Sequence, residues 1–233
     1  MYDNIFHFKQ FSINDSDCGM KVCTDSVLFG AWINVANAKK ILDIGTGSGL
    51  ISLMLAQKSS ATITAIEICG EAANNAAINF LNSPWANRLQ IINSSFEDYV
   101  KTSFEKYDTI VCNPPWYNCI KPLDSKRKTA KHRETLEYET IVAGVNKLLS
   151  NTGIFHVVLP CSESENFRHK ALISGLYLNS EILIYTKINN KPKRIFMSFG
   201  FERKNIEKEY INIYDKNGQY SDKYKKIIYD FYV

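Results

Sequence analysis

The sequence predicts an α/β protein built on a doubly wound, mostly parallel sheet of seven strands with a Rossmann-like layout. From residue 41 onward, short runs of β-branched residues alternate with longer helical stretches, which is typical of a parallel sheet with helices on both faces. A glycine-rich turn follows the first run, and two consecutive prolines end the fourth. Both features mark loops at strand ends, where a doubly wound sheet binds its ligands.

Each predicted element follows from its local pattern. The first strand leads into a helix over residues 49–58, where apolar side chains recur at helical spacing. Residues 71–81 are rich in alanine, a strong helix former, and the runs on either side favour strands. In full, strands are expected at residues 41–44, 62–66, 89–92, 107–112, 153–159, 177–186 and 194–201, the last two as an antiparallel hairpin. Helices are expected at residues 49–58, 71–81, 134–149, 163–174 and 224–232, with Ser221 capping the last.

The chain is long enough for one sizeable hydrophobic core but short for two domains, since it has 233 residues of which 45% are hydrophobic. We therefore predict a single domain over residues 1–233. Residues 1–34 precede the first strand and contain three phenylalanines between positions 6 and 11, so we expect this segment to cap the sheet. Residues 35–233 are expected to form the Rossmann-like core.

Composition limits the class of protein further. The N-terminus lacks a basic stretch leading into an apolar run, and no segment approaches the roughly 18 apolar residues of a membrane span. We therefore expect a cytoplasmic protein with no membrane partner. We also expect a monomer. The six cysteines form no CxxC pair and have no histidines at zinc-ligand spacing, so no metal is expected. A net charge of +4 is too small to establish a nucleic-acid partner by itself.

The glycine-rich turn is a candidate cofactor site. Asp43 lies on the first strand, and Gly45, Gly47 and Gly49 follow in a GxGxG pattern that lets a ligand approach the backbone. A carboxylate at Asp43 would repel a pyrophosphate but suits an ammonium or sulfonium group. Glu67 ends the second strand, where its carboxylate can accept hydrogen bonds from both hydroxyls of a ribose. S-adenosylmethionine carries all these groups and is the predicted cofactor; a nicotinamide site and a turn without ligand are the alternatives.

Phe96 is a further predicted cofactor contact. It follows the third strand, where methyltransferases of similar layout place residues around the adenine ring of the cofactor. Its ring could pack on that adenine, and a position in the hydrophobic core is the alternative. Ser95 stands where many such enzymes have an acidic residue that binds the adenine amine.

The tetrapeptide Asn113-Pro114-Pro115-Trp116 ends the fourth strand and resembles the (D/N)PP(Y/F/W) motif of amino-methyltransferases. The Asn113 side-chain oxygen and the Pro114 carbonyl can each accept one hydrogen of an adenine N6 amine, and the prolines fix these acceptors in advance. Trp116 offers a face on which the target base can stack. Asn113 lies next to the predicted cofactor turn and is also expected to contact the cofactor. A rigid turn with a buried tryptophan is the alternative.

A strongly basic segment over residues 121–133 begins shortly after this motif. Basic side chains beside the mouth of a site can contact phosphates without reading sequence, so we predict an RNA surface here. The predicted RNA-binding residues are Lys126, Arg127, Lys128, Lys131, His132 and Arg133. Basic residues over 187–194 could extend this surface. A solvated charged loop is the alternative for both segments.

Taken together, the chain resembles the tRNA1(Val) adenine-37 N6-methyltransferases, a family of class I S-adenosylmethionine-dependent enzymes. The stretch over residues 20–32 is similar to the family's MKVGTDGVLLGAW-type segment, and residues 219–232 resemble its tail. The resemblance implies methylation of the N6 amine of A37, with tRNA as the partner. It also implies that Lys21, Thr24 and Asp25 lie against the cofactor. Cys23 and Ser26 replace glycines of the family segment.

Three other functions remain open from the residues alone. A protein glutamine of a release factor is an alternative acceptor, because an NPP motif can also hold a carboxamide nitrogen. The N2 amine of a guanine in ribosomal RNA is another. A non-catalytic RNA-binding protein with the same fold is the third.

Overall fold

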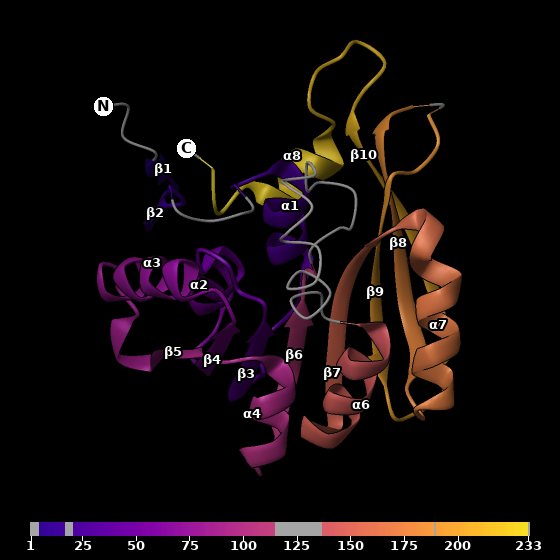
Figure 1. The fold of residues 1–233 in the computed structure, drawn as a ribbon. Coiled ribbons are helices and arrows are strands. Elements are labelled where there is room, and N and C mark those ends of the chain that lie inside the picture. The colour runs from indigo at the N-terminus through magenta and orange to yellow at the C-terminus, as the bar shows by residue number, and fades with distance from the viewer. Residues whose placement is uncertain (1–4, 17–20, 115–136, 189, 233) are drawn as a thin grey trace, which may run out of the picture.

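The computed structural model describes residues 5–16, 21–114, 137–188 and 190–232. Its centre is an eight-stranded sheet with the order β10-β8-β9-β7-β6-β3-β4-β5 (Figure 1). The strands are β3 (Lys40–Ile44), β4 (Thr62–Glu67), β5 (Leu89–Asn93), β6 (Tyr107–Cys112), β7 (Leu149–Pro160), β8 (Tyr177–Lys187), β9 (Arg194–Gly200) and β10 (Glu207–Tyr214). The helices are α1 (Thr24–Trp32), α2 (Leu50–Lys58), α3 (Gly70–Leu81), α4 (Phe96–Thr102), α6 (Tyr138–Leu148), α7 (Ser164–Ile173) and α8 (Asp222–Ile228).

The sheet is doubly wound and mostly parallel, which confirms the predicted fold class. β9 is the exception, because it runs antiparallel to both β7 and β8. All seven predicted strands are present, and an eighth, β10, corrects the predicted count. β10 is an edge strand that pairs with β8, and its first half is exposed and charged, so it lacks the apolar alternation by which strands are recognised.

The core is divided by the sheet into two apolar clusters. One contains buried side chains of α1, α2, α3 and α8, and the other contains those of α4, α6 and α7. Both faces of the central strands are therefore covered, which explains their continuous apolar sequences. Ser221 caps α8 as predicted, since its hydroxyl oxygen accepts a hydrogen bond from the Tyr224 amide at 3.2 Å.

The N-terminal segment lies beside the C-terminal tail. β1 (Ile5–His7) and β2 (Ser12–Asn14) form a small antiparallel sheet, and the Lys9 amide donates to the Phe231 carbonyl at 2.9 Å (Figure 1). This segment then leads into α1, which packs against α2 and α8. Neither α1 nor α4 was predicted from the sequence. Within the described ranges, no helix combines the length and the apolar character needed to cross a membrane.

Candidate active site

Three neighbouring strands end at one point on the edge of the sheet. β3 lies between β4 and β6, and the parallel register pairs Ile44, the last residue of β3, with the penultimate residue of β4 and the last residue of β6. Gly45, Glu67 and Asn113 are therefore the next residues along three adjacent strands. The glycine turn and the Asn-Pro corner, far apart in the sequence, meet at the carboxyl edge of the sheet.

The glycine-rich turn between β3 and α2 has open space next to its backbone. Gly45 and Gly47 have φ angles of 68° and 58°, and a Cβ added at either would meet no atom within 4 Å. The turn is held at its base, because the amides of Gly45 and Thr46 both donate to the Ile66 carbonyl, at 2.9 and 3.0 Å. The two missing side chains leave a fixed cradle that a ligand can fill.

Asp43 lies beside this turn with only 1% of its surface exposed. Its Oδ2 accepts hydrogen bonds from Thr46 Oγ1 at 2.6 Å and Ser52 Oγ at 2.7 Å, whereas Oδ1 has no hydrogen-bond partner among the described residues. Burial raises the pKa of the carboxyl to about 6, the two hydroxyl hydrogen bonds oppose this shift, and the charge of Glu67 adds to it. A buried carboxylate with one unsatisfied oxygen is suited to a cationic ligand.

Glu67 lies at the mouth of the same turn. Its Oε2 accepts the Gly47 amide and its Oε1 accepts the Cys69 amide, both at 2.9 Å, so the carboxylate is fixed before any ligand arrives. The next residue, Ile68, is 50% exposed and presents an apolar surface beside this carboxylate. The sequence does not predict that Ile68 is exposed. Ile68 lies beside Glu67 because β4 ends at Glu67.

Asn113 is held by the first turn of α1. Its side-chain Nδ2 donates to Ser26 Oγ at 3.1 Å, and the following residue, Pro114, is buried. Asp25, next to Ser26, forms an ion pair with Arg194 of β9 at 3.1 Å. The start of α1 is thus attached both to the end of β6 and to the start of β9. The contact between Ser26 and Asn113 was not predicted, because it joins residues 87 positions apart.

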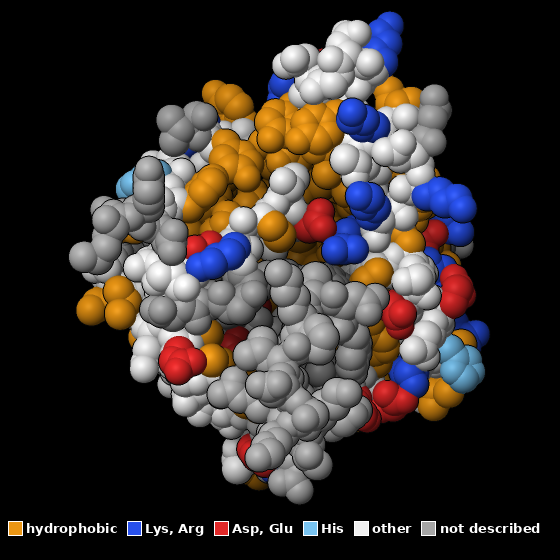
Figure 2. Space-filling model, turned by 45° about the horizontal axis from the view of Figure 1, so that its top comes forward, with side chains coloured by type: hydrophobic (Ala, Val, Ile, Leu, Met, Phe, Trp, Pro, Cys, Tyr) orange, Lys and Arg blue, Asp and Glu red, His pale blue; other side chains and the backbone are white. Residues whose placement is uncertain are grey.

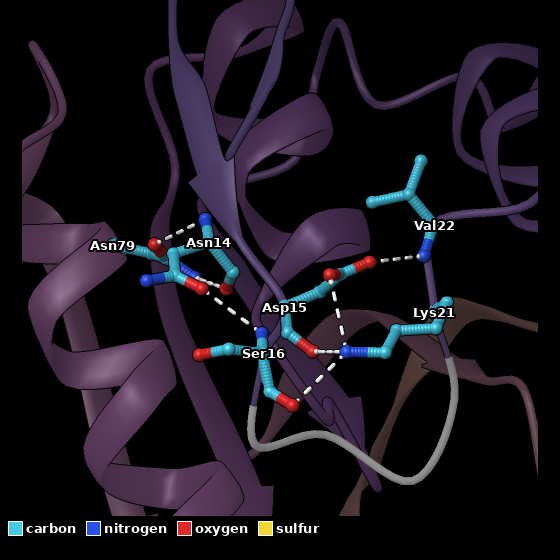
Figure 3. A network of polar contacts seen from close by, with 6 residues as sticks. All are labelled: Asn14, Asp15, Ser16, Lys21, Val22 and Asn79. Carbon is cyan, nitrogen blue, oxygen red and sulfur yellow. Dashed lines mark hydrogen bonds and ion pairs between the residues drawn. The ribbon is translucent and has the colours of Figure 1, made fainter. Parts of the chain in front are cut away.

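The side chain of Lys21, predicted to contact the cofactor, is directed to the loop after β2. Its ammonium donates to the Ser16 carbonyl at 3.0 Å and pairs with Asp15 at 3.4 Å (Figure 3). Asp15 also accepts the amide of Val22 at 2.8 Å, which closes the loop between β2 and α1. The resemblance also implies Thr24 and Asp25. Thr24 is the half-buried first residue of α1, and Asp25 pairs with Arg194.

Asn79 of α3 connects this N-terminal loop to the glycine turn. Its side chain donates to the Asn14 carbonyl at 2.8 Å and accepts the Asn14 amide at 2.9 Å (Figure 3). It also donates to the Ser48 carbonyl at 2.8 Å. With 4% of its surface exposed, the amide is fully enclosed. Ser48 belongs to the turn itself, so the position of the turn depends on a residue that no local pattern identifies.

Phe96, predicted to pack on the cofactor's adenine, lies in the hydrophobic core. It is 5% exposed, and a Cβ added at Gly144 of α6 would lie 2.4 Å from its ring. This close packing favours the core alternative. Ser95 caps α4, because its oxygen accepts the Asp98 amide at 3.1 Å while its hydroxyl donates to Asp98 Oδ2 at 2.8 Å.

Several predicted residues lie outside the described residues. They are Pro115 and Trp116 of the Asn-Pro corner and the predicted RNA contacts Lys126, Arg127, Lys128, Lys131, His132 and Arg133.

Cys112, at the end of β6, is buried, and burial together with the charge of Asp43 raises the pKa of its thiol well above the usual range. It therefore remains a neutral core thiol at physiological pH. Across the described ranges, no group of histidine, cysteine and acidic side chains could hold a metal.

The family model for the methyltransferase small domain matches residues 11–160, a range that includes the glycine-rich turn, Glu67 and Asn113. A predicted O-methyltransferase from Agrobacterium tumefaciens has a similar fold, with a TM-score of 0.66 over 88% of this chain and 95% of that one at 14% identity. The glycopeptide N-methyltransferase MtfA, complexed with sinefungin, aligns with a TM-score of 0.57 over 77% of this chain and 86% of that one at 10% identity. Fold and site together define a methyltransferase.

Comparison with curated relatives identifies a particular family of methyltransferases. The tRNA1(Val) (adenine(37)-N6)-methyltransferase of Bacteroides fragilis (strain YCH46) is 43% identical, and the alignment covers 100% of this chain and 99% of the relative. The chain belongs to the tRNA1(Val) (adenine(37)-N6)-methyltransferase family. The resemblance stated from the sequence is therefore confirmed.

Proposed function

We propose that this chain transfers a methyl group from S-adenosylmethionine to the N6 amine of adenine 37 in tRNA1(Val), the activity that its family is named for. One observation carries the proposal. A cradle suited to a cationic ligand, formed by Asp43, Gly45 and Gly47, lies directly beside the amide of Asn113 at the edge of the sheet. A substrate of this kind would be met in the cytoplasm.

The cradle residues have complementary roles in binding the cofactor. The unsatisfied Oδ1 of Asp43 would accept a hydrogen bond from an ammonium group, and the carboxylate of Glu67 would accept the hydroxyls of an unphosphorylated ribose. The exposed side chain of Ile68 offers an apolar surface for an aromatic base. When bound, S-adenosylmethionine supplies an electrophilic methyl group on a sulfonium centre.

Asn113 and Pro114 would hold the acceptor amine. The lone pair of an exocyclic adenine amine is delocalised into the ring, so the nitrogen is a weak nucleophile. The side-chain oxygen of Asn113 and the carbonyl of Pro114 would each accept one N6 hydrogen and orient the nitrogen for attack. Acceptors fixed in advance stabilise the charge that develops on the amine without a strong base. Trp116 would stack on the target base and offset part of the cost of unstacking it.

Nucleoside mass spectrometry of purified tRNA1(Val) tests the proposed reaction. Cells that contain this protein should yield N6-methyladenosine from position 37, and cells that lack it should yield unmodified adenosine there. The two populations should be otherwise isogenic, with a plasmid copy of the gene restoring the modification. Unchanged N6-methyladenosine in the tRNA, with loss of a methylated glutamine or of an N2-methylguanosine elsewhere, would reject adenine as the acceptor.

We further propose that tRNA contacts the carboxyl edge of the sheet around the catalytic corner. Lys187, Lys191 and Lys193 are exposed at the turn from β8 to β9, and none of them forms an ion pair within the described ranges. β8 ends at this edge, and β9 begins there, as its first residue pairs with the last residue of β7. Figure 2, with the top of the molecule turned forward, has several Lys and Arg side chains on this face. The basic segment over residues 121–133 would contribute further phosphate contacts.

Substitution of Lys187, Lys191 and Lys193 by alanine should weaken tRNA binding about equally for cognate and unrelated tRNA, since phosphate contacts carry no sequence information. The slope of log Kd against log salt should become shallower by up to about 1 for each phosphate that the variant no longer neutralises. Charge reversal of Lys126, Arg127 and Lys128 should have the same kind of effect. Filter binding at several salt concentrations measures both quantities.

A matched triple substitution controls for the change in net charge. Lys39, Lys101 and Lys106 are exposed at or near the opposite, amino edge of the sheet. Their replacement by alanine removes the same charge far from the site and should leave the salt slope nearly unchanged. Equal slopes for the two triple variants would place the RNA surface elsewhere.

A further inference from the structure

We infer that Ser26 is a positioning residue, which fixes the orientation of the Asn113 side-chain amide so that its oxygen accepts from the target amine. The inference rests on the proposed function and goes beyond it, because Ser26 touches neither reacting group. It follows from one hydrogen bond, in which Asn113 Nδ2 donates to Ser26 Oγ at 3.1 Å.

The chemistry of an amide makes its orientation decisive. The two ends of the Asn113 side chain have similar shapes, but the oxygen accepts hydrogen bonds and the NH2 group only donates them. A flipped amide would direct its own hydrogens toward those of the substrate amine, and the amine would lose an acceptor. A hydrogen-bond acceptor on one side of the amide selects one of the two orientations.

The surroundings of Ser26 make its oxygen such an acceptor. Ser26 is 5% exposed, so water does not compete for the contact. Cys23 Sγ lies 3.2 Å from Ser26 Oγ and can accept the hydroxyl hydrogen. With that hydrogen directed to the sulfur, the lone pairs of the serine oxygen face the Asn113 NH2 group. The side-chain oxygen of Asn113, about 120° away around the amide carbon, is then directed to a different side.

Ser26 can hold this position because α1 is anchored at both ends. At its start, Asp25 pairs with Arg194 of β9 at 3.1 Å. At its end, the Lys58 ammonium donates to the carbonyls of Gly30, Ala31 and Ile33, which places a positive charge at the helix C-terminus. A rigidly held serine limits the motion of the amide, and such second contacts decide how well a catalytic group is preorganised.

The test compares Ser26→Ala in two backgrounds, with natural Asn113 and with Asn113→Asp. In the natural background, the loss of one positioning hydrogen bond should lower kcat for tRNA methylation about tenfold, with little change in the Kd for S-adenosylmethionine. Ser26→Thr keeps the hydroxyl and should retain most of the activity. In the Asn113→Asp background, both carboxylate oxygens accept hydrogen bonds, so there is no orientation to select. Ser26→Ala should then change kcat far less.

Each outcome decides something different. An equal fractional loss in both backgrounds, measured by this double-mutant cycle, would make Ser26 a structural residue and overturn the inference. So would unchanged kcat for Ser26→Ala with natural Asn113. A folded protein with natural Ser26 and Asn113 that leaves tRNA1(Val) unmethylated would reject the proposed function itself. Melting temperatures of all variants identify any loss of kcat that comes from unfolding.

Discussion

Replacing Asn113 with alanine is expected to lower kcat for methyl transfer by about 10²–10³-fold, the usual cost of removing one preorganised group that acts on the transition state. The Kd for S-adenosylmethionine should change little, because in the proposed reaction the side chain binds the acceptor amine and the cradle of Asp43, Gly45 and Glu67 remains intact. Single-turnover methylation of tRNA1(Val) transcripts measures the rate, and calorimetric titration measures cofactor binding.

Asn113→Asp is the matched control for this experiment. A carboxylate has the same shape as the amide and keeps an acceptor oxygen for the target amine, so Asn113→Asp should keep far more activity than alanine. The Ser26 hydroxyl can donate to the new carboxylate, so the local packing should survive. An Asn113→Ala variant with weakened cofactor binding and a normal rate at saturating cofactor would contradict the assigned role.

Much of the site can be predicted from the sequence, because it depends on residues that directly follow parallel strands. Asp43, Glu67 and Asn113 each belong to or follow a strand with a clear apolar pattern. Once the strands are parallel and adjacent, their carboxyl ends must meet at one edge. The strand pattern therefore predicts that these three residues lie together, and the roles proposed for them rest on the chemistry of their side chains.

The supporting contacts could not be predicted, because they join distant segments through single side chains. Asn79 reaches the glycine turn from α3, and Ser26 reaches Asn113 from α1. Both are polar residues in otherwise ordinary helical sequences, where the local pattern indicates neither burial nor a partner. For Phe96 the sequence allows two positions, one against the cofactor and one in the hydrophobic core. Its packing against α6 places it in the core.

Replacing Asp43 with asparagine is expected to weaken S-adenosylmethionine binding by about 10- to 100-fold, because it removes the proposed charge-assisted hydrogen bond to the cofactor's ammonium. The same change should raise the free energy of unfolding at pH 7. Burial raises the pKa of Asp43 from its ordinary 3.8 to about 6, so folding opposes its ionisation by roughly 3 kcal/mol at neutral pH. Asparagine keeps an acceptor for Thr46 and Ser52 without that cost. Thermal unfolding and calorimetric titration measure the two effects.

Folding stability and cofactor affinity should depend on the ionisation of Asp43 in opposite ways, which provides a sharp test of its proposed role. Between about pH 4 and 6 the folded Asp43 carboxyl holds its proton more tightly than the unfolded one, so its contribution to stability should decrease as pH rises through this window. Buried His156 contributes in the opposite direction, because burial lowers its pKa to about 3. The proposed hydrogen bond to the cofactor's ammonium needs the ionised carboxylate, so affinity should increase with pH from 5 to 7 and level off above the pKa of about 6. In Asp43→Asn the stability should therefore rise more steeply with pH over this window than in the natural protein, and the pH dependence of cofactor affinity should largely disappear. If its cofactor affinity keeps the pH dependence of the natural protein, the titrating group is not Asp43, and its carboxylate does not bind the cofactor's ammonium.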